Sequence, residues 1–418
     1  MASRFFYTLS ILFLFACKEK PTISQAVTIN ESPKSPTQNF TPQPADSLTS
    51  EEALKLIIQA QKDKSKSLRL ADLSQPIPKE LWQLTQLETL DLSGYGLPTL
   101  PDSFGLLKNL KYLILNGTNL SILPNSFGQL INLCELYLSG SFNFPKIPIS
   151  ALKLTKSRYL EINGLEATGK NSDSYTLPSS ISNLKSLQEI DMYKGSIGHL
   201  PDNFGDLKNL LYLNMGVNDI NSLPESFVNL HLDTLYLDLH TMTVLPENFG
   251  NIHVKCLFLN NTKLTTLPES FGNIENLEEL NISQSQLKQL PQSFGNLKHL
   301  KILKLYNNKL KDLPSSFNQL TELESLELHV NEFRAVPPSL CSLVNLKYLD
   351  LGNNNISTLP ACFAGFQKLE YLSLFNNNFT TFPPIINQLS QLQALDFRKN
   401  QLTTFPKSIK AMKKMKNT

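Results

Sequence analysis

The sequence predicts an α/β solenoid, a stack of similar units that each bury their apolar side only against their neighbours. Three observations lead to this prediction. A hydrophobic residue followed by proline recurs from Ile77-Pro78 to Phe405-Pro406, and most successive prolines of this series are 23 residues apart. Between these pairs, leucines alternate with polar residues, and a phenylalanine follows most of the prolines at a fixed distance. A fixed period of this length is typical of a repeat stack.

Each unit contains one predicted strand and one predicted turn region. In Leu349-Asp350-Leu351 apolar residues flank a polar one, as in a strand that buries one face. The Pro-x-Ser-Phe-Gly stretch does not suit a central strand, because proline cannot donate a hydrogen bond to a neighbouring strand. We expect it to form short helical turns on the opposite side. The phenylalanines should stack into an apolar spine; they are Phe104, Phe127, Phe204, Phe227, Phe249, Phe271, Phe294, Phe317 and Phe363.

The pattern L-x-x-L-x-L-x-x-N-x-L occurs at Leu346, Leu349, Leu351, Asn354 and Ile356, and again one repeat later. With these in-phase copies, the region 67–406 resembles the leucine-rich repeat family, in its bacterial 23-residue form. The resemblance implies a horseshoe with a concave parallel β-sheet and a convex side of short helical turns and loops. It also implies an asparagine ladder that bonds to the backbone of neighbouring turns, at Asn218, Asn308, Asn331, Asn354, Asn377 and Asn400.

The first 16 residues have the composition of a signal peptide. Arg4 precedes a largely apolar run over 5–15 that is too short to span a bilayer. The run ends in Leu14-Phe15-Ala16-Cys17, which resembles the lipobox of bacterial lipoproteins and implies cleavage before Cys17 and lipidation of its thiol. Lys18 rather than aspartate then implies the outer membrane, with the protein on its surface or periplasmic face. The alternative is an ordinary signal peptide with an incidental cysteine.

Segments outside the repeats are predicted to tether and cap them. Residues 17–50 begin with the lipidated cysteine and continue as a disordered tether rich in Pro, Ser, Thr and Gln. Residues 51–66 predict a capping helix with Ser50 as a candidate N-cap and Leu54, Ile57 and Ile58 on one face. Residues 407–418 predict a basic C-terminal cap or tail.

The composition excludes several classes of function. The formal net charge is +2, so a nucleic-acid partner is not expected. The chain has no second hydrophobic span after the signal segment. It also lacks a G-x-S-x-G motif, an H-E-x-x-H motif and a glycine-rich phosphate loop, so we expect neither an enzyme nor a cofactor.

The cysteines and histidines do not form a recognisable site either. After Cys17 the cysteines are Cys134, Cys256, Cys341 and Cys362, whose spacing fits no zinc motif and no disulfide framework. A bridge is not predicted, although Cys341 and Cys362 lie in adjacent repeats. His231 and His253 occupy equivalent positions one strand spacing apart, about 5 Å. We interpret them as polar residues of the convex edge rather than as a metal pair, because asparagine is frequent at this position.

The outward residues of the strands carry the predicted binding surface. Alignment of the repeats gathers aromatic and acidic residues on the N-terminal and middle part of the concave face, namely Tyr112, Glu135, Tyr137, Tyr159, Glu161, Glu189, Asp191, Tyr193, Tyr212, Tyr236 and Phe258. A secondary set lies further on, beside Lys301, Lys304 and Lys347, and consists of Tyr306, Tyr348, Tyr371 and Phe375.

These residues predict a lipid-anchored envelope protein that binds a protein partner on its concave face. Tyrosine offers a large contact area at small entropic cost, and carboxylates favour a partner with basic groups. One alternative is a glycan-binding surface module, because aromatic rings stack on sugars. Another is a structural envelope protein without a specific ligand, whose aromatics only reflect strand propensity.

Two further features lie close to this surface. Glu161 and Asp191 fall at the same position of adjacent strands, so we expect one of them to be protonated or a cation to lie between them. They are not interpreted as a glycosidase pair, because no enclosing pocket or sugar-binding motif accompanies them. Residues 165–175 lengthen one repeat and predict a surface loop, with either a functional or an inert role.

Overall fold

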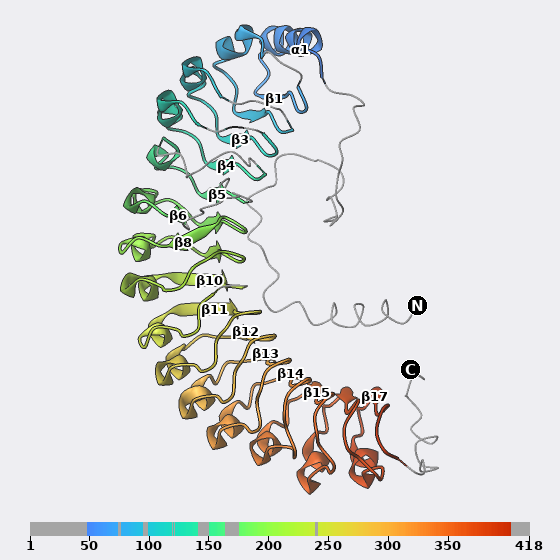
Figure 1. Ribbon diagram of the computed structural model, residues 1–418. Coiled ribbons are helices and arrows are strands. Elements are labelled where there is room, and N and C mark those ends of the chain that lie inside the picture. Colours follow the sequence, from blue (N-terminus) through green and yellow to red (C-terminus); the bar gives the residue numbers. More distant parts are fainter. Residues whose placement is uncertain are drawn as a thin grey trace, which may run out of the picture.

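The computed structural model describes residues 48–73, 77–94, 99–118, 120, 122–140, 150–163, 175–238 and 241–402. They form one curved stack, with strands along the concave side and short helical turns along the convex side (Figure 1). The predicted solenoid is therefore confirmed. The signal segment 1–16, Cys17, the tether up to residue 47, the insertion up to residue 174 and the tail 407–418 lie outside the described residues.

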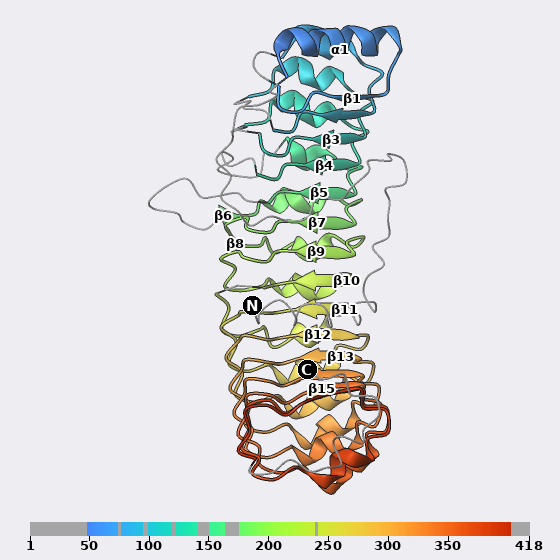
Figure 2. The same cartoon turned by 90° about the vertical axis from the view of Figure 1, so that its right-hand side faces the viewer.

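Fifteen parallel strands form the concave sheet, in the order in which they occur in the chain (Figure 2). They are β1 (Ser67–Arg69), β2 (Thr89–Asp91), β3 (Tyr112–Ile114), β4 (Glu135–Tyr137), β5 (Tyr159–Glu161), β7 (Glu189–Asp191), β9 (Tyr212–Asn214), β10 (His231–Tyr236), β11 (His253–Phe258), β12 (Glu279–Asn281), β13 (Ile302–Lys304), β14 (Ser325–Glu327), β15 (Tyr348–Asp350), β16 (Tyr371–Ser373) and β17 (Ala394–Asp396). A second sheet pairs β6 (Tyr175–Thr176) with β8 (Ile197–His199).

The repeat length fixes the register of the sheet. Leu349 of β15 lies between Leu326 and Leu372 of its neighbours, and all three side chains are fully buried. The flanking residues of each strand point to the concave surface, because side chains alternate along a strand. Residues one repeat apart in the chain therefore lie side by side on that surface.

The convex side consists of 3₁₀ turns, as the proline-containing stretches predict. They span Lys79–Gln83, Asp102–Leu106, Asn125–Gln129, Ala151–Lys153, Ser179–Asn183, Phe204–Asp206, Glu225–Asn229, Phe249–Asn251, Glu269–Asn273, Gln292–Asn296, Ser315–Gln319, Pro338–Ser342, Ala361–Gly365 and Pro384–Gln388. All nine predicted phenylalanine rings are buried, and they stack as predicted in the runs Phe104–Phe127, Phe204–Phe227 and Phe249–Phe271–Phe294–Phe317. Phe294, for example, stacks between Phe271 and Phe317 at centroid distances of 6.1 and 5.9 Å. A Cβ atom on Gly295 would lie 2.0 Å from the Ser316 carbonyl oxygen, so this turn packs closely only with glycine.

The asparagine ladder connects the ends of β9 and of β13 to β17 to their neighbours. Asn331 is buried, and its side-chain amide donates to the carbonyl oxygens of Leu305 and Leu328, both at 3.0 Å. Its own side-chain oxygen accepts the Leu310 N–H at 3.0 Å. The ladder predicted from the repeat pattern is thereby confirmed; it satisfies backbone groups that the turn leaves without strand partners.

Helix α1 (Ser50–Lys62) covers the first repeat (Figure 1). It is shorter than the predicted range, and its N-cap is Thr49 rather than Ser50. The Thr49 hydroxyl accepts the Glu52 N–H, while the Glu52 carboxylate accepts the Thr49 N–H, which is a capping box. No helix in the described ranges is long and apolar enough to span a membrane.

The apolar face of α1 is only partly the predicted one. The buried residues are Ala53, Ile57 and Ala60, which recur at the spacing of one helical face. The prediction for Ile57 is confirmed, but Ile58 is 53% exposed and the prediction for it is wrong. The small alanine side chains let the helix approach the first repeat closely, and a prediction based on large apolar residues overlooked them.

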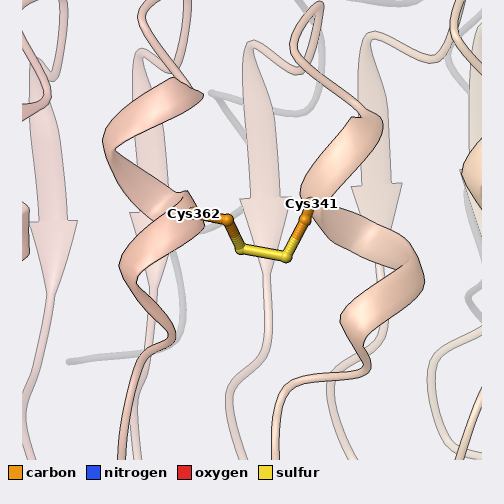
Figure 3. The surroundings of a disulfide bond; sticks show 2 residues. All are labelled: Cys341 and Cys362. Carbon is orange, nitrogen blue, oxygen red and sulfur yellow. A yellow bond between two sulfur atoms is a disulfide. The ribbon is translucent and has the colours of Figure 1, made fainter.

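A disulfide bond that the cysteine spacing did not predict links two convex turns. Cys341 lies on the turn Pro338–Ser342 and Cys362 on the turn Ala361–Gly365, and their sulfur atoms are bonded across the interface between these repeats (Figure 3). The Cα atoms are 5.4 Å apart, a common separation for a disulfide. The turns stack in register, which brings residues 21 positions apart into bonding distance. The sequence did not indicate this bond, because two cysteines in adjacent repeats lack the regular cysteine spacing of small disulfide-rich domains.

Candidate functional site

The predicted surface residues of β4, β5 and β7 lie together at the centre of the N-terminal half of the concave sheet. The register places Glu135 beside Tyr159 and then Glu189, and Tyr137 beside Glu161 and then Asp191. We refer to these six residues as the acidic-aromatic patch. Four carboxylates therefore share the outward positions of three strands, and none of these positions carries a lysine or arginine.

Hydrogen bonds within the patch occupy the tyrosine hydroxyl protons. Tyr137 donates to the Glu135 carboxylate at 2.7 Å, and Tyr159 donates to the Glu161 carboxylate at 2.9 Å. The Ser139 hydroxyl also donates to Glu161. Since a hydroxyl has one proton and a carboxylate has none, the patch offers oxygen acceptors to a ligand and few donors. It is therefore suited to ligand groups that donate hydrogen bonds and carry positive charge.

The ionisation of the patch follows from its burial. Burial, and secondarily the neighbouring carboxylates, raises the pKa of Tyr137 and of Tyr159 well above the usual range, so both phenols remain hydrogen-bond donors at neutral pH. Burial also raises the pKa of Asp191, and the charge of Glu161 adds to this shift. The N–H of Tyr193, which donates to Asp191 at 3.2 Å, opposes it. The two carboxylates are adjacent as predicted, but burial is the larger cause of the shift.

The other predicted aromatics continue the patch on both sides. Tyr112 lies beside Glu135 on β3, and Tyr212, Tyr236 and Phe258 follow on β9 to β11. The rings of Tyr236 and Phe258 stack with a centroid distance of 4.4 Å and an interplanar angle of 8°. One face of the Tyr236 ring is therefore covered by Phe258, and one face of the Phe258 ring by Tyr236. Tyr193 lies beyond β7, is 39% exposed, and has the Lys194 ammonium 5.6 Å from its ring centroid.

The secondary set forms a separate patch towards the C-terminal end. Tyr348 and Tyr371 are adjacent and stack at 4.4 Å, whereas Tyr306 stacks on His329 at 4.5 Å. Phe375 lies under the cationic groups of Arg398 and Lys399. The lysines that the sequence places nearby are paired with glutamates, as Lys301–Glu278, Lys304–Glu327 and Lys347–Glu324.

Sequence reasoning missed several acidic residues of the concave face. Glu327, Asp350 and Asp396 lie on β14, β15 and β17 at the third strand position, close to the secondary set. Asp238 follows β10, and burial raises its pKa to about 6, although the Asn260 N–H that it accepts at 2.7 Å acts against the shift. Alignment of the repeats could have predicted these residues, because each occupies a position that alternation along the strand places on the outward face.

The two histidines lie side by side on neighbouring strands, as the sequence predicts, and they are the first residues of β10 and β11. His231 and His253 are adjacent and exposed, and their rings stack at a centroid distance of 4.2 Å. No group of three or more His, Cys, Asp or Glu side chains in the described part of the chain could hold a metal ion. The concave sheet is an open surface rather than an enclosed pocket.

Fold and surface together define a repeat solenoid, with a parallel sheet that displays side chains in fixed rows. Family models agree with this class: a leucine-rich repeat region matches residues 64–199 and 247–337, and a second leucine-rich repeat model matches residues 321–379. The chain belongs to the leucine-rich repeat family. No curated protein matches it.

Solved structures with the same architecture include proteins from distant organisms. A leucine-rich repeat protein of Leptospira interrogans is 29% identical, with a TM-score of 0.60 over 84% of this chain and 87% of that one. A plant peptide hormone receptor in complex with RGF2 is 25% identical, with a TM-score of 0.58 over 84% of this chain and 66% of the receptor. In the Drosophila Toll–Spatzle complex the similar chain is 21% identical, with a TM-score of 0.60 and coverage of 81% and 51%, a likeness of fold alone.

Proposed function

We propose that this protein is a recognition protein without enzymatic activity that binds a protein partner through basic groups on its acidic-aromatic patch. The observation that carries the proposal is the set of four carboxylates among tyrosines at outward positions that hold no cation. An arginine or lysine of a partner supplies both the charge and the hydrogen-bond donors that this surface lacks. The similar plant receptor recognises a peptide hormone, and this likeness supports a protein ligand.

Ring geometry favours a protein over the glycan alternative. A sugar stacks on a free aromatic face, but Tyr236 with Phe258 and Tyr348 with Tyr371 present parallel rings at 4.4 Å, so one face of each ring is already covered by its neighbour. Such pairs present ring edges, and their tyrosines also present hydroxyl groups, to a ligand. These groups suit the side chains of a protein segment better than the flat face of a sugar ring.

We further propose that the protein acts outside the cytoplasm, anchored to the outer membrane of a bacterium through a lipid on Cys17. The signal-like start and the cysteine at its end support the anchor. The bond between Cys341 and Cys362 supports the compartment, because structural disulfides persist in oxidising surroundings and are rare in the reducing cytosol. Protease treatment of intact source cells, with lysed cells as the control, tests whether the repeats face outward or into the periplasm.

The binding proposal is tested by removing charge from the patch while keeping its shape. We expect the double variant Glu161→Gln/Asp191→Asn to capture the partner from source-cell extracts at least tenfold less well than the wild type, because a cationic hot-spot contact typically contributes more than about 1.4 kcal/mol. The matched control is Tyr348→Ala/Tyr371→Ala in the secondary patch, which should leave capture unchanged. Equal capture by the wild type and the charge variant would refute the role of the acidic-aromatic patch. Binding to a glycan array with no protein captured would instead support the alternative.

A further inference from the structure

A row of side chains runs along the edge of the concave sheet, one residue before the first outward position of each repeat. The backbone fixes the row: the N–H of Arg158 donates to the Cys134 carbonyl at 2.7 Å, and the N–H of Gln188 donates to the Arg158 carbonyl at 2.9 Å. Over most of its length the row alternates in charge and neighbours pair, as in Lys66–Glu88, Glu88–Lys111, Asp233–Lys255, Glu278–Lys301 and Glu324–Lys347, with nitrogen–oxygen distances of 2.6–2.8 Å.

The alternation is interrupted next to the acidic-aromatic patch. Here Arg158 lies between Cys134 and Gln188, which are neutral, instead of between two acids. Arg158 is exposed and forms no ion pair with any residue that the structure describes. Lys156, two residues earlier, bonds to the neutral side-chain oxygen of Asn132 at 2.8 Å. Two cations therefore stand together without a counter-ion among the described residues.

These two cations line a hollow. Its volume is about 430 Å³, and its walls are Cys134, Lys156, Arg158, Ser186, Gln188 and Asn209. Besides the guanidinium and ammonium groups, the Ser186 hydroxyl and the Gln188 amide can donate hydrogen bonds into it. A guanidinium matches the two oxygens of a carboxylate with a pair of parallel hydrogen bonds. The lining thus has the chemistry of a carboxylate site.

We propose that this hollow binds a carboxylate of the same partner whose basic group occupies the acidic-aromatic patch; the inference rests on the proposed function. Arg158 precedes Glu161 by three residues in one extended stretch, which corresponds to about 10 Å between their Cα atoms. A bound segment that runs along β5 therefore carries a lysine or arginine and a carboxylate about 10 Å apart on one face. In an extended segment these residues are two or four positions apart, because side chains alternate between its faces. Either an acidic side chain or the carboxyl terminus of the partner supplies that carboxylate.

The test is a selection of random peptides against the full-length protein, with the library displayed once with free carboxyl termini and once as internal segments. We expect enrichment of a basic residue two or four positions from an acid, or at the same distance from the free terminus. The two display formats distinguish a side chain from a terminal carboxylate. For a peptide selected in this way, Arg158→Gln should weaken binding at least tenfold, which is about 1.4 kcal/mol. Lys301→Gln, a cation of the same row that is already paired with Glu278, should not change it.

Each result decides between the two proposals. Enrichment of basic residues without an acidic partner position, or full binding by Arg158→Gln, overturns the carboxylate site and leaves the proposed function intact. If the wild type selects peptides with basic residues and the variant Glu161→Gln/Asp191→Asn does not, the result supports the role of the acidic-aromatic patch, independently of the carboxylate site. If the wild type enriches no basic residue at all, both proposals fail. A second readout is independent of affinity: an occupying peptide should slow alkylation of the Cys134 thiol, measured at that residue by mass spectrometry, and unchanged alkylation at saturating peptide overturns the site.

Discussion

The asparagine ladder allows one stability prediction to be worked out bond by bond, for Asn331→Ala. The wild-type side chain makes three hydrogen bonds in a buried position: it donates to the carbonyl oxygens of Leu305 and Leu328 and accepts from the N–H of Leu310. Alanine removes all three bonds. The backbone groups that lose their partner cannot turn to solvent, because the flanking strands and turns hold them in place.

The three losses are not equal. The Leu305 carbonyl keeps a bond from Asn308 at 3.0 Å, and the Leu328 carbonyl keeps one from Asn354 at 3.1 Å. Only the Leu310 N–H loses the partner that the ladder supplies. An unsatisfied buried group costs about 1–3 kcal/mol and a lost but partly compensated bond about 0.5 kcal/mol. The variant should therefore be destabilised by about 3 kcal/mol.

Urea denaturation followed by circular dichroism measures this loss. The matched control is Asn183→Ala on an exposed convex turn, where a change below about 0.5 kcal/mol is expected. Asn331→Asp should be at least as damaging as alanine. A carboxylate can accept the Leu310 N–H, but it has no proton to donate, so its second oxygen repels the carbonyl oxygens of Leu305 and Leu328. If Asn331→Ala lost no more stability than the control, the ladder bonds would not stabilise the stack as argued.

Two further predictions concern the disulfide and a buried carboxyl. Replacing Cys341 and Cys362 together by serine should cost about 3 kcal/mol, because the bond closes a loop of 21 residues in the unfolded chain; an unchanged urea midpoint in the double variant would contradict the estimate. Burial raises the pKa of Asp238 to about 6, so the folded state binds its proton more tightly than the unfolded state, and its contribution to stability falls as the pH rises from about 4 to 6. Asp238→Asn should therefore stabilise the protein at pH 7 by about 1 kcal/mol, after allowance for partial exposure, with no gain below about pH 4. A gain that is the same at both pH values would show that the titration of this carboxyl is not its cause.

Much of the candidate site could be predicted because the repeat itself sets the register. Tyr137, Glu161 and Asp191 lie in one row because equivalent positions of successive repeats pair in the sheet. The same rule places His231 beside His253. Register depends on repeat length and alternation, which can be counted directly along the chain.

The sequence by itself determined the solenoid, the buried leucines, the phenylalanine spine and the asparagine ladder, because each of these depends on the position of a residue within its own repeat. The tertiary structure alone decided which of the side chains that the register brings together form ion pairs or a disulfide. It showed that the lysines near Tyr348 are neutralised by glutamates, that Arg158 has no such partner among the described residues, and that Cys341 reaches Cys362. Such contacts depend on side-chain direction and on distances of a few ångströms between neighbouring turns. The repeat period leaves both open, since it fixes the course of the backbone but not the orientation of the side chains that it carries.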